Sequence, residues 1–561
     1  MSAADPSDGP GARSAPVDRV VLAVVAVTLL ALAARIVGLG SRPFHWDEAR
    51  VGYWSLRFLD TGTFEYRPIA GGPFLYIVER YVLGAVGATD ATARAVVAAV
   101  GGCSPLAALL FRRRRSSDVS AVPRYRLTDA ETVAMAGLLA ISPVLLYYGR
   151  FLRGDLPLAV FGLVVVGCAV RVLDAEDAAA ARPYRYLGAA ALAVAVAASA
   201  FVVGYLLCWL AAAALTVDQR RLVDAGAEAR SNLDAAFERL YGSARSALGA
   251  VGLFLVVHLF FYAPRVDGSI RPSPATVEAA VLGAARAFYG VRVAGRRQGG
   301  EHQLLPYLSA HVETLLAASA VVVGLAAVGF LADRYGRGGT RPVIAFHAYW
   351  AGASLLVFPV ITEESAAWLT VHTVAPAVVP AAAAVGLLGR YASRSLSRDD
   401  AVGVAVAALI ALAVAGQLGV AAAGTAYGPT TPENPLAHHA QPADDLDPFV
   451  ADVSTAIEGN DGVDVLFYGP EFVPTYDDQP DRPPVSDAWG NRLPLPWYLE
   501  RLGAETDGVR EEAGLDTLES QPPVIVADAS RRAALSARLE GYQSSTYRLS
   551  LWNREVVVFV R

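Results

Sequence analysis

Two adjacent carboxylates, Asp47 and Glu48, follow the first long apolar run, in the segment HWDEARVGYW. Carboxylates at a membrane surface are costly unless they are solvated, paired or functional. Such a carboxylate could deprotonate an attacking hydroxyl group or orient it. The pair could also mark a helix N-terminus, where acidic residues favour the helix dipole. With Arg50 nearby, this segment is the first candidate site. Asp47 is the predicted base, and Glu48 is predicted to position the substrate.

A second candidate group lies in YYGRFLRGDLPLAV, which ends the third apolar run. We predict that Arg150, Arg153 and Asp155 lie at the same membrane surface as Asp47. A guanidinium group there could bind a lipid phosphate through two parallel hydrogen bonds. The alternative is a local Arg153–Asp155 ion pair, with Arg150 extending its charged end toward the membrane surface.

The loop 265–310 carries further arginines on this surface. We predict that Arg296 and Arg297 attract an anion such as a phosphate headgroup, and that His302 belongs to the same site. A lone histidine is more often a structural residue than a catalyst. A second alternative for this loop is that the number of spans differs by one.

The segment TEESAAWLTVHTVAP places Glu364, Trp368 and His372 four residues apart, and hence on one face of a predicted helix. Trp368 could simply anchor the helix at the membrane interface. His372 is predicted to lie about two turns into the membrane, where an ionisable group tends to be functional.

The elements that must position these residues are membrane spans. The chain is 54% hydrophobic, with a mean hydropathy of +0.39, and its apolar runs are long enough to cross a bilayer. These features predict a polytopic α-helical membrane protein. The eleven predicted spans lie at 20–40, 91–111, 129–148, 155–173, 186–200, 201–217, 246–264, 311–333, 342–361, 366–389 and 401–424. Since the halves of 186–217 are short, one long tilted helix is the alternative there.

The distribution of arginine orients these spans. Arginine-rich loops follow the second, sixth, eighth and tenth spans, and the positive-inside rule places such loops in the cytoplasm. Residues 1–19 are then a cytoplasmic tail, and residues 20–424 are the transmembrane domain. Residues 425–445 are a linker, and residues 446–561 form an extracytoplasmic domain. The first outer loop is predicted to contain in-plane helices.

The predicted C-terminal domain alternates strand-like and helical runs, which is typical of a small α/β domain. From residue 440 onward the chain has 22 Asp and Glu against 10 Arg, and the whole chain contains no lysine. An acidic exterior without lysine suits high salt, as in a halophile. A GC-rich genome is the alternative explanation. The three cysteines lie in apolar spans, so they predict no disulfide framework.

Carboxylates and arginines at one membrane surface suit sugar transfer from a polyprenyl-phosphate donor, with inversion at the anomeric carbon. Asp47–Glu48 with Arg50, and the Arg150-x-x-Arg153-x-Asp155 element, resemble the GT-C superfamily of membrane glycosyltransferases. The resemblance is closer to the protein O-mannosyltransferase and aminoarabinose-transferase group.

Within that group the chain is similar to the haloarchaeal flippase activity-associated family, which is linked to S-layer N-glycosylation. HWDEARVGYW, RFLRGDLPLAV, the Trp368–His372 segment and LPLPWYLERLG carry this similarity. The resemblance implies a polyprenyl- or dolichyl-phosphate lipid and a glycan or glycoprotein acceptor. It also implies membrane lipids and other N-glycosylation proteins as partners, and no nucleic acid.

One departure from the group leaves the activity open. Many relatives carry a Lys-Glu pair between the fifth and sixth spans, where this chain has ASAFVVGYLL. A non-catalytic accessory of dolichol-linked glycan flipping is therefore an alternative, and a secondary transporter is a weaker one. The sequence specifies no cofactor, although Asp47 and Glu48 could hold Mg²⁺ or Mn²⁺.

Overall fold

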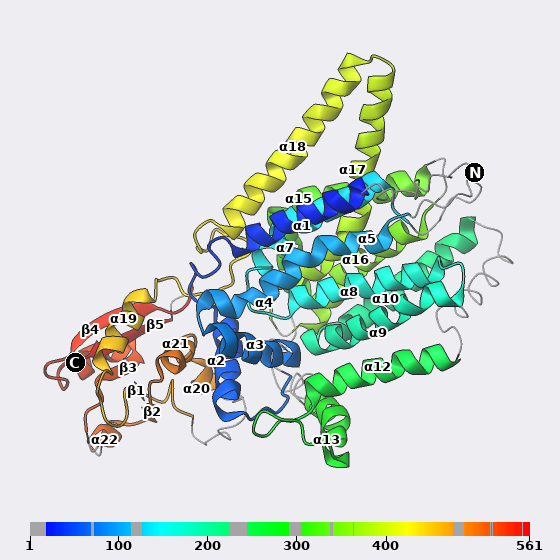
Figure 1. Cartoon of the computed structure of the whole chain (residues 1–561). Helices are drawn as coiled ribbons and strands as arrows, with labels where there is room; N and C mark the ends of the chain where they lie inside the picture. The colour runs from blue at the N-terminus through cyan, green and yellow to red at the C-terminus, as the bar shows by residue number, and fades with distance from the viewer. Residues whose placement is uncertain are drawn as a thin grey trace, which may run out of the picture.

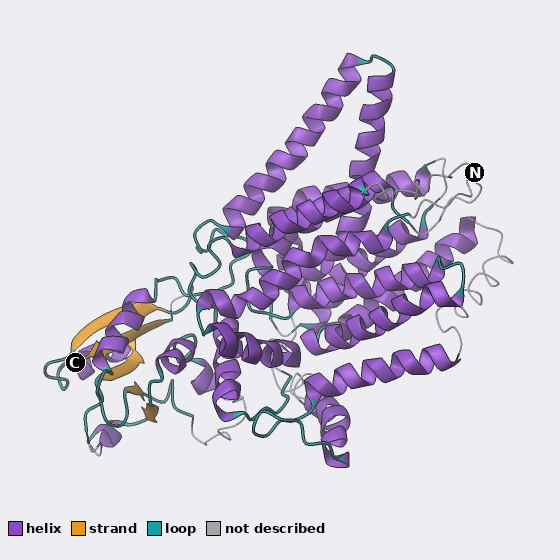
Figure 2. Ribbon diagram, in the orientation of Figure 1, coloured by secondary structure: helices purple, strands orange, loops and turns teal. Residues whose placement is uncertain are grey.

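A computed structural model places the elements relative to one another (Figures 1 and 2). The structure describes residues 18–68, 72–113, 126–223, 244–290, 304–336, 340–362, 364–474, 487–516, 518, 520–551 and 554–561.

The described residues form a large helical bundle and a smaller domain with a sheet. The first helices are α1 (Arg19–Ile36), α2 (Trp46–Thr61), α3 (Gly72–Val86), α4 (Asp90–Cys103), η1 (Ser104–Ala107), α5 (Ala108–Phe111), α6 (Asp129–Ile141), α7 (Pro143–Tyr148), α8 (Asp155–Leu173), α9 (Ala178–Ala198) and α10 (Val202–Val223). The next are α12 (Ala244–Tyr262), α13 (Pro274–Glu278), η2 (Ala279–Gly283), α14 (Ala284–Phe288), α15 (Leu304–Tyr335), α16 (Pro342–Ile361), η5 (Ala367–Leu369), α17 (Thr370–Ser397) and α18 (Ala401–Ala426).

Nine of the described helical segments are long and apolar enough to cross a membrane. The structure thereby confirms a polytopic helical membrane protein, although not the number eleven. One predicted span that is missing from the nine, 129–148, is divided into α6 and α7 at Ser142, because Pro143 begins a new helix. The other, 186–200, lies in α9, whose first half contains Arg182 and Arg185. The single tilted helix considered for 186–217 is wrong, since the chain leaves the helical path between α9 and α10.

Helix α17 forms the centre of the bundle. It packs against α6, α8, α15, α16 and α18, and 83% of its most apolar window is buried. Near one end of the bundle, Glu131 of α6 is fully buried and accepts two hydrogen bonds from Arg341, at 2.8 and 3.2 Å. Arg390 of α17 binds the same carboxylate at 3.1 Å, and Asp333 of α15 binds Arg341 at 2.6 Å. This network joins α6, α15 and α17 to the residue that precedes α16.

The sheet domain lies at the opposite end of the bundle, on the side of α2 (Figure 1). Its strands are β1 (Val465–Tyr468), β2 (Thr506–Val509), β3 (Val524–Asp528), β4 (Gln543–Arg548) and β5 (Glu555–Val560), and its helices are α19 (Asp447–Ala456), α20 (Asp487–Gly490), α21 (Leu495–Leu502), α22 (Glu512–Leu515), η6 (Ala529–Arg531) and α23 (Arg532–Ser536). The strand order is β2-β1-β3-β5-β4. The first three strands are parallel, whereas β5 is antiparallel to both β3 and β4. A small α/β domain is therefore confirmed.

Helix α21 docks this domain on α2. Trp497 stacks on Phe44 with ring centroids 4.7 Å apart, and its indole N–H donates to Asp90 at the start of α4, at 2.8 Å. The Tyr498 hydroxyl donates to the same carboxylate at 3.1 Å. A Cβ added at Gly52 of α2 would lie 2.6 Å from the Trp497 ring, so the close contact requires glycine there.

The linker that leads into this domain makes hydrogen bonds both to the helical bundle and to the sheet domain. The Tyr148 hydroxyl donates to the Leu436 carbonyl at 2.8 Å, and the Gln441 amide donates to the Pro43 carbonyl at 2.8 Å. On the side of the sheet domain, the Leu551 N–H donates to the His439 carbonyl at 2.9 Å. The linker is thus packed between the two domains.

Candidate functional site

The first turn of α2 is fixed by a capping box. The Asp47 N–H donates to Nδ1 of His45 at 3.0 Å, while the His45 N–H donates to Glu48 at 3.1 Å. The two carboxylates of this turn then have different surroundings.

Glu48 is fully buried, and its oxygen atoms accept four hydrogen bonds. Arg94 of α4 donates two of them at 2.7 Å each, and the Leu152 N–H donates a third at 2.8 Å. Although burial would raise the pKa of Glu48, the guanidinium groups of Arg94 and Arg42 lower it. Because these bonds occupy the carboxylate, Glu48 holds the start of α2 against α4 and offers no oxygen to a substrate or metal. This differs from the predicted roles of Glu48.

Asp47 begins a chain of charged contacts that joins three predicted site residues. Arg153 binds the Asp47 carboxylate, and its Nε donates to Asp155 at 2.9 Å. Nε2 of His372 lies 3.2 Å from the other Asp155 oxygen, and the Tyr205 hydroxyl lies 3.1 Å from Nδ1 of His372. The local Arg153–Asp155 pair is present, but it is one link of a longer chain.

Trp368 packs against this chain. The Arg153 guanidinium lies 3.8 Å from the centroid of the Trp368 ring. The ring of His438, a residue of the linker, has its centroid 4.5 Å from that of Trp368. Trp368 is 1% exposed, so it forms a buried wall. The predicted common helical face is not formed, because Glu364 precedes the helix, Trp368 lies in η5, and His372 is in the first turn of α17.

The remaining predicted arginines are placed elsewhere. Arg150 donates to the carbonyl groups of Ala34 and Gly38, at 3.1 and 2.9 Å, so it caps the end of α1. Arg50 lies over the Trp46 ring at 5.4 Å. Arg296, Arg297 and His302 lie outside the described residues.

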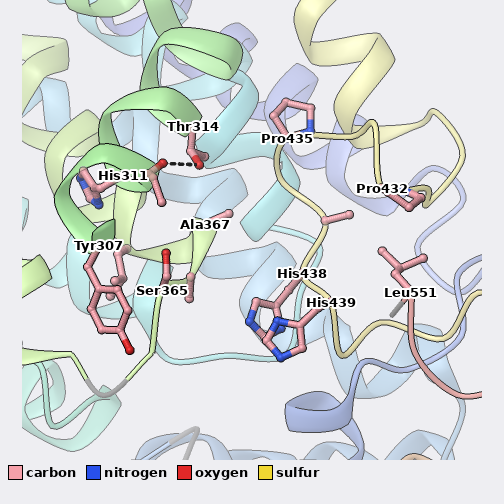
Figure 3. A pocket seen from close by; sticks show the side chains of 14 residues that line it. Tyr307, His311, Thr314, Ser365, Ala367, Pro432, Pro435, His438, His439 and Leu551 are labelled. Carbon is pink, nitrogen blue, oxygen red and sulfur yellow. Dashed lines mark hydrogen bonds between the residues drawn. The ribbon is translucent and has the colours of Figure 1, made fainter. Parts of the chain in front are cut away.

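A cavity of about 430 Å³ opens beside Asp47. Its lining comes from the start of α2, the loop between α16 and η5, the linker and the C-terminal domain. The lining residues are His45, Trp46, Asp47, Glu364, His438, His439, Ala440, Ser550 and Arg554. A second cavity of about 260 Å³ shares His438 and His439 with it, and Figure 3 shows these two rings side by side near Leu551. Asp47 therefore faces a space that could hold part of a substrate.

Five residues at this site were not predicted: Arg94, Tyr205, His45, His438 and Arg554. An arginine inside an otherwise apolar predicted span is a signal that could have found Arg94. The His438–His439 pair in a polar linker is a weaker signal. The sequence around Arg554 gives no signal, since only the tertiary structure brings this residue to the cavity.

One group of three ligand-type side chains within the described ranges lies close enough to hold a metal ion. The ligand atoms of Glu364, His438 and His439 are all within 4.8 Å of one another. However, the Ala440 N–H donates to Nδ1 of His438 at 3.3 Å, so a neutral His438 carries its proton at Nε2. A metal ligand must be an unprotonated nitrogen. The present arrangement therefore does not fit a metal at His438.

Comparisons with known proteins agree with the described architecture. Residues 446–561 match the family model of the Agl23 flippase-associated protein C-terminal domain. No curated protein sequence matches the chain. The structure of ArnT from Cupriavidus metallidurans in the apo state is similar with a TM-score of 0.59 and 15% identity, over 97% of this chain and 98% of that chain.

Two further structures are similar over nearly the whole chain. ArnT from C. metallidurans bound to undecaprenyl phosphate has a TM-score of 0.53 and 18% identity, over 96% of this chain and 97% of that chain. The oligosaccharyltransferase of Archaeoglobus fulgidus in the apo form has a TM-score of 0.52 and 13% identity, over 95% of this chain and 75% of that chain. The resemblance inferred from the sequence is confirmed: the chain shares its fold with these GT-C glycosyltransferases, and its residues 446–561 are similar to the C-terminal domain of the Agl23 flippase-associated proteins.

Proposed function

We propose that this protein is a membrane glycosyltransferase. In this proposal it takes a sugar from a polyprenyl-phosphate donor, such as dolichyl phosphate, on the extracytoplasmic face, in cell-surface protein N-glycosylation. The observation that carries the proposal is the Asp47–Arg153–Asp155 chain beside a cavity. The neighbouring ArnT structure with undecaprenyl phosphate supports a lipid of this class, because all polyprenyl phosphates share the same headgroup.

In the proposed reaction an acceptor hydroxyl oxygen attacks the anomeric carbon from the face opposite the phosphate. The new carbon–oxygen bond forms while the bond to phosphate breaks, and the electron pair leaves with the phosphate. The hydroxyl proton passes to the Asp47 carboxylate. The configuration at the anomeric carbon is inverted.

Arg153 is suited to stabilise the departing phosphate. Its guanidinium is fixed between Asp47 and Asp155 and rests on Trp368, so little reorganisation is needed when negative charge develops. His372 and Tyr205 hold Asp155 in place. In this proposal Glu48 is a positioning residue that acts through α2.

A second candidate function is a non-catalytic accessory of dolichol-linked glycan flipping. The description of the matched domain as flippase-associated favours it. The two functions differ in what accumulates when the protein is lost. A transferase leaves glycans that lack one sugar, with the sugar donor retained outside. A flipping accessory leaves the complete lipid-linked sugar on the inner leaflet.

The test is deletion of the gene, followed by complementation with the wild type or with Asp47→Asn. Mass spectrometry of surface glycans and lipid-linked intermediates is the readout. We expect Asp47→Asn to lower transfer by about 10²- to 10⁴-fold, with normal membrane insertion. Asp444→Asn is the matched control, because Asp444 pairs with Arg548 away from the cavity. Complete glycans in the Asp47→Asn strain would refute the catalytic role.

A further inference from the structure

The cavity beside Asp47 is shared between two domains. His45 and Asp47 belong to the start of α2, and His438 belongs to the linker. Arg554, by contrast, directly precedes β5 of the sheet domain. The C-terminal domain therefore supplies a charged side chain to the space where we place the reaction.

Hydrogen bonds from backbone N–H groups determine the tautomers of two histidines in the wall of this cavity. The Asp47 N–H donates to Nδ1 of His45, and the Ala440 N–H donates to Nδ1 of His438. Burial lowers the pKa of both histidines, so both rings are neutral near pH 7. A neutral ring that accepts at Nδ1 carries its proton at Nε2. Nε2–H of His45 therefore donates to Nδ1 of His438, 3.1 Å away.

This chain of donors ends at Nε2–H of His438. That nitrogen is buried, and it has no hydrogen-bond partner within the described part of the chain. His438 is only 7% exposed, and it lines the cavity beside Asp47. Leaving a buried donor unpaired is unfavourable, because the hydrogen bond that it made to water is lost. The Glu364 carboxylate lies within 4.8 Å of the histidine nitrogens but makes no hydrogen bond with Nε2 of His438.

Arg554 has a similar deficit. Its guanidinium donates to the Leu493 carbonyl, but its Nε is buried without a hydrogen-bond partner. It forms no ion pair with any carboxylate among the described residues. Burial lowers the pKa of Arg554 to about 10. A partly buried guanidinium that has no counter-ion favours the binding of an anion, since the anion supplies the missing charge partner.

We propose that His438 and Arg554 form a subsite for an oxyanion of the substrate, so that the C-terminal domain completes the transferase site. The shared chemistry is a carboxylate or phosphate oxygen that accepts from both groups. It belongs either to the carboxylate of an acidic acceptor sugar or to the phosphate of the donor lipid. The assignment to a substrate rests on the proposed transferase function, whereas the subsite itself can be measured without turnover.

The test measures binding to the full-length protein in lipid nanodiscs by saturation-transfer NMR and calorimetry. The probes are methyl β-glucuronide, its neutral counterpart methyl β-glucoside, and inorganic phosphate. His438→Asn keeps an acceptor near the Nδ1 position and removes the Nε2–H donor, whereas Arg554→Gln removes the charge. Arg492→Gln is the matched control, because Arg492 is also a half-buried arginine of the C-terminal domain, binds a backbone carbonyl, and does not line the cavity.

We expect each subsite variant to weaken anion binding about tenfold, with little change in the control. His438→Gln, which returns an amide N–H near the Nε2 position, should restore part of the affinity even if His438→Asn folds poorly. Glu364→Gln should strengthen binding, since it removes a like charge from the cavity. Preference for the glucuronide assigns the subsite to the acceptor, and preference for phosphate assigns it to the donor.

Three results would overturn the subsite: no anion binding, equal binding by wild type and both variants, or tight Zn²⁺ binding that is lost in His438→Asn and Glu364→Gln. The last result would make Nε2 of His438 a metal ligand instead of a donor. Since binding is read without turnover, anion binding that depends on Arg554, combined with unchanged transfer in Asp47→Asn, would refute only the catalytic proposal.

Discussion

Glu48 at one end of the bundle and Glu131 at the other occupy closely similar surroundings. Each is the third residue of its helix and closes a capping box, each is fully buried, and each accepts two hydrogen bonds from one arginine, Arg94 or Arg341. The two ends of the bundle differ in what lies beside each glutamate–arginine pair. Near Glu48, the neighbouring Asp47 faces a cavity.

The Glu131 end is a closed network. Arg341 is also held by Asp333, and Arg390 completes the shell of the carboxylate. At the Glu48 end, the contacts continue through Arg153 to buried groups, and Arg554 lacks a counter-ion among the described residues. Burial and ion pairing are therefore common to both ends. Unsatisfied hydrogen-bonding groups beside a cavity distinguish the end where we place chemistry.

The largest effect is expected from breaking the two matched pairs. Glu48→Gln should lower the free energy of unfolding by about 3–5 kcal/mol, because it leaves the buried Arg94 without its charge partner. Glu131→Gln should cost less, since Asp333 still pairs with Arg341. Unfolding by SDS titration in mixed micelles measures this. Only Glu48→Gln should also impair transfer by the folded protein, since it loosens the turn that carries Asp47. Equal transfer by the two folded variants would remove the distinction between the ends.

The second-largest effect is expected from replacing an arginine at the Glu48 end, compared with an arginine at the Glu131 end. Arg153→Gln should lower transfer by about 10²- to 10³-fold, because it removes the fixed charge beside the departing phosphate. Arg390→Gln is the matched change at the Glu131 end, and its side chain is 43% exposed. It should leave transfer by the folded protein near the wild-type level. Initial rates with a polyprenyl-phosphate sugar donor provide the comparison.

A smaller effect is expected at the contact between α2 and α21. Gly52→Ala should cost about 1–3 kcal/mol, because the added methyl group meets the rigid Trp497 ring. Gly84→Ala is the control, since its Cβ would meet only the flexible side chain of Leu59, at 3.1 Å. Limited proteolysis of the C-terminal domain reports on docking. Unchanged cleavage in Gly52→Ala would argue against a tight contact.

The smallest effect is a dependence of stability on pH. Burial lowers the pKa of His45 and His438 below the ordinary value of about 6.5. The unfolded chain therefore binds protons first, and stability falls as the pH drops below about 6.5. Each histidine contributes about 1 kcal/mol per pH unit there. Melting temperatures between pH 7.5 and 5 should show a shallower slope for His438→Asn. An unchanged slope would mean that His438 has the same pKa in the folded and the unfolded chain.

Local sequence patterns predicted much of this architecture. Apolar length identified the membrane helices, and the acidic pair in HWDEARVGYW indicated a helix N-terminus, so the start of α2 was readable. The order of short motifs also brought Asp47, Arg153 and Asp155 to one surface. The separate roles of Asp47 and Glu48 could not be read, because they depend on Arg94 arriving from another helix. The hydrogen bonds of His438 depend in the same way on the tertiary placement of His45.

The linker has a consequence for how such proteins can be recombined. Its bonds to Tyr148, Pro43 and Leu551 fix its path between the two domains, and its histidines line the cavity. It therefore cannot act as a flexible tether whose length is free to vary. Chimeras that exchange the C-terminal domain between relatives should work only when the native linker travels with it. The segment that can be exchanged between relatives must therefore begin before residue 446, so that it includes the linker.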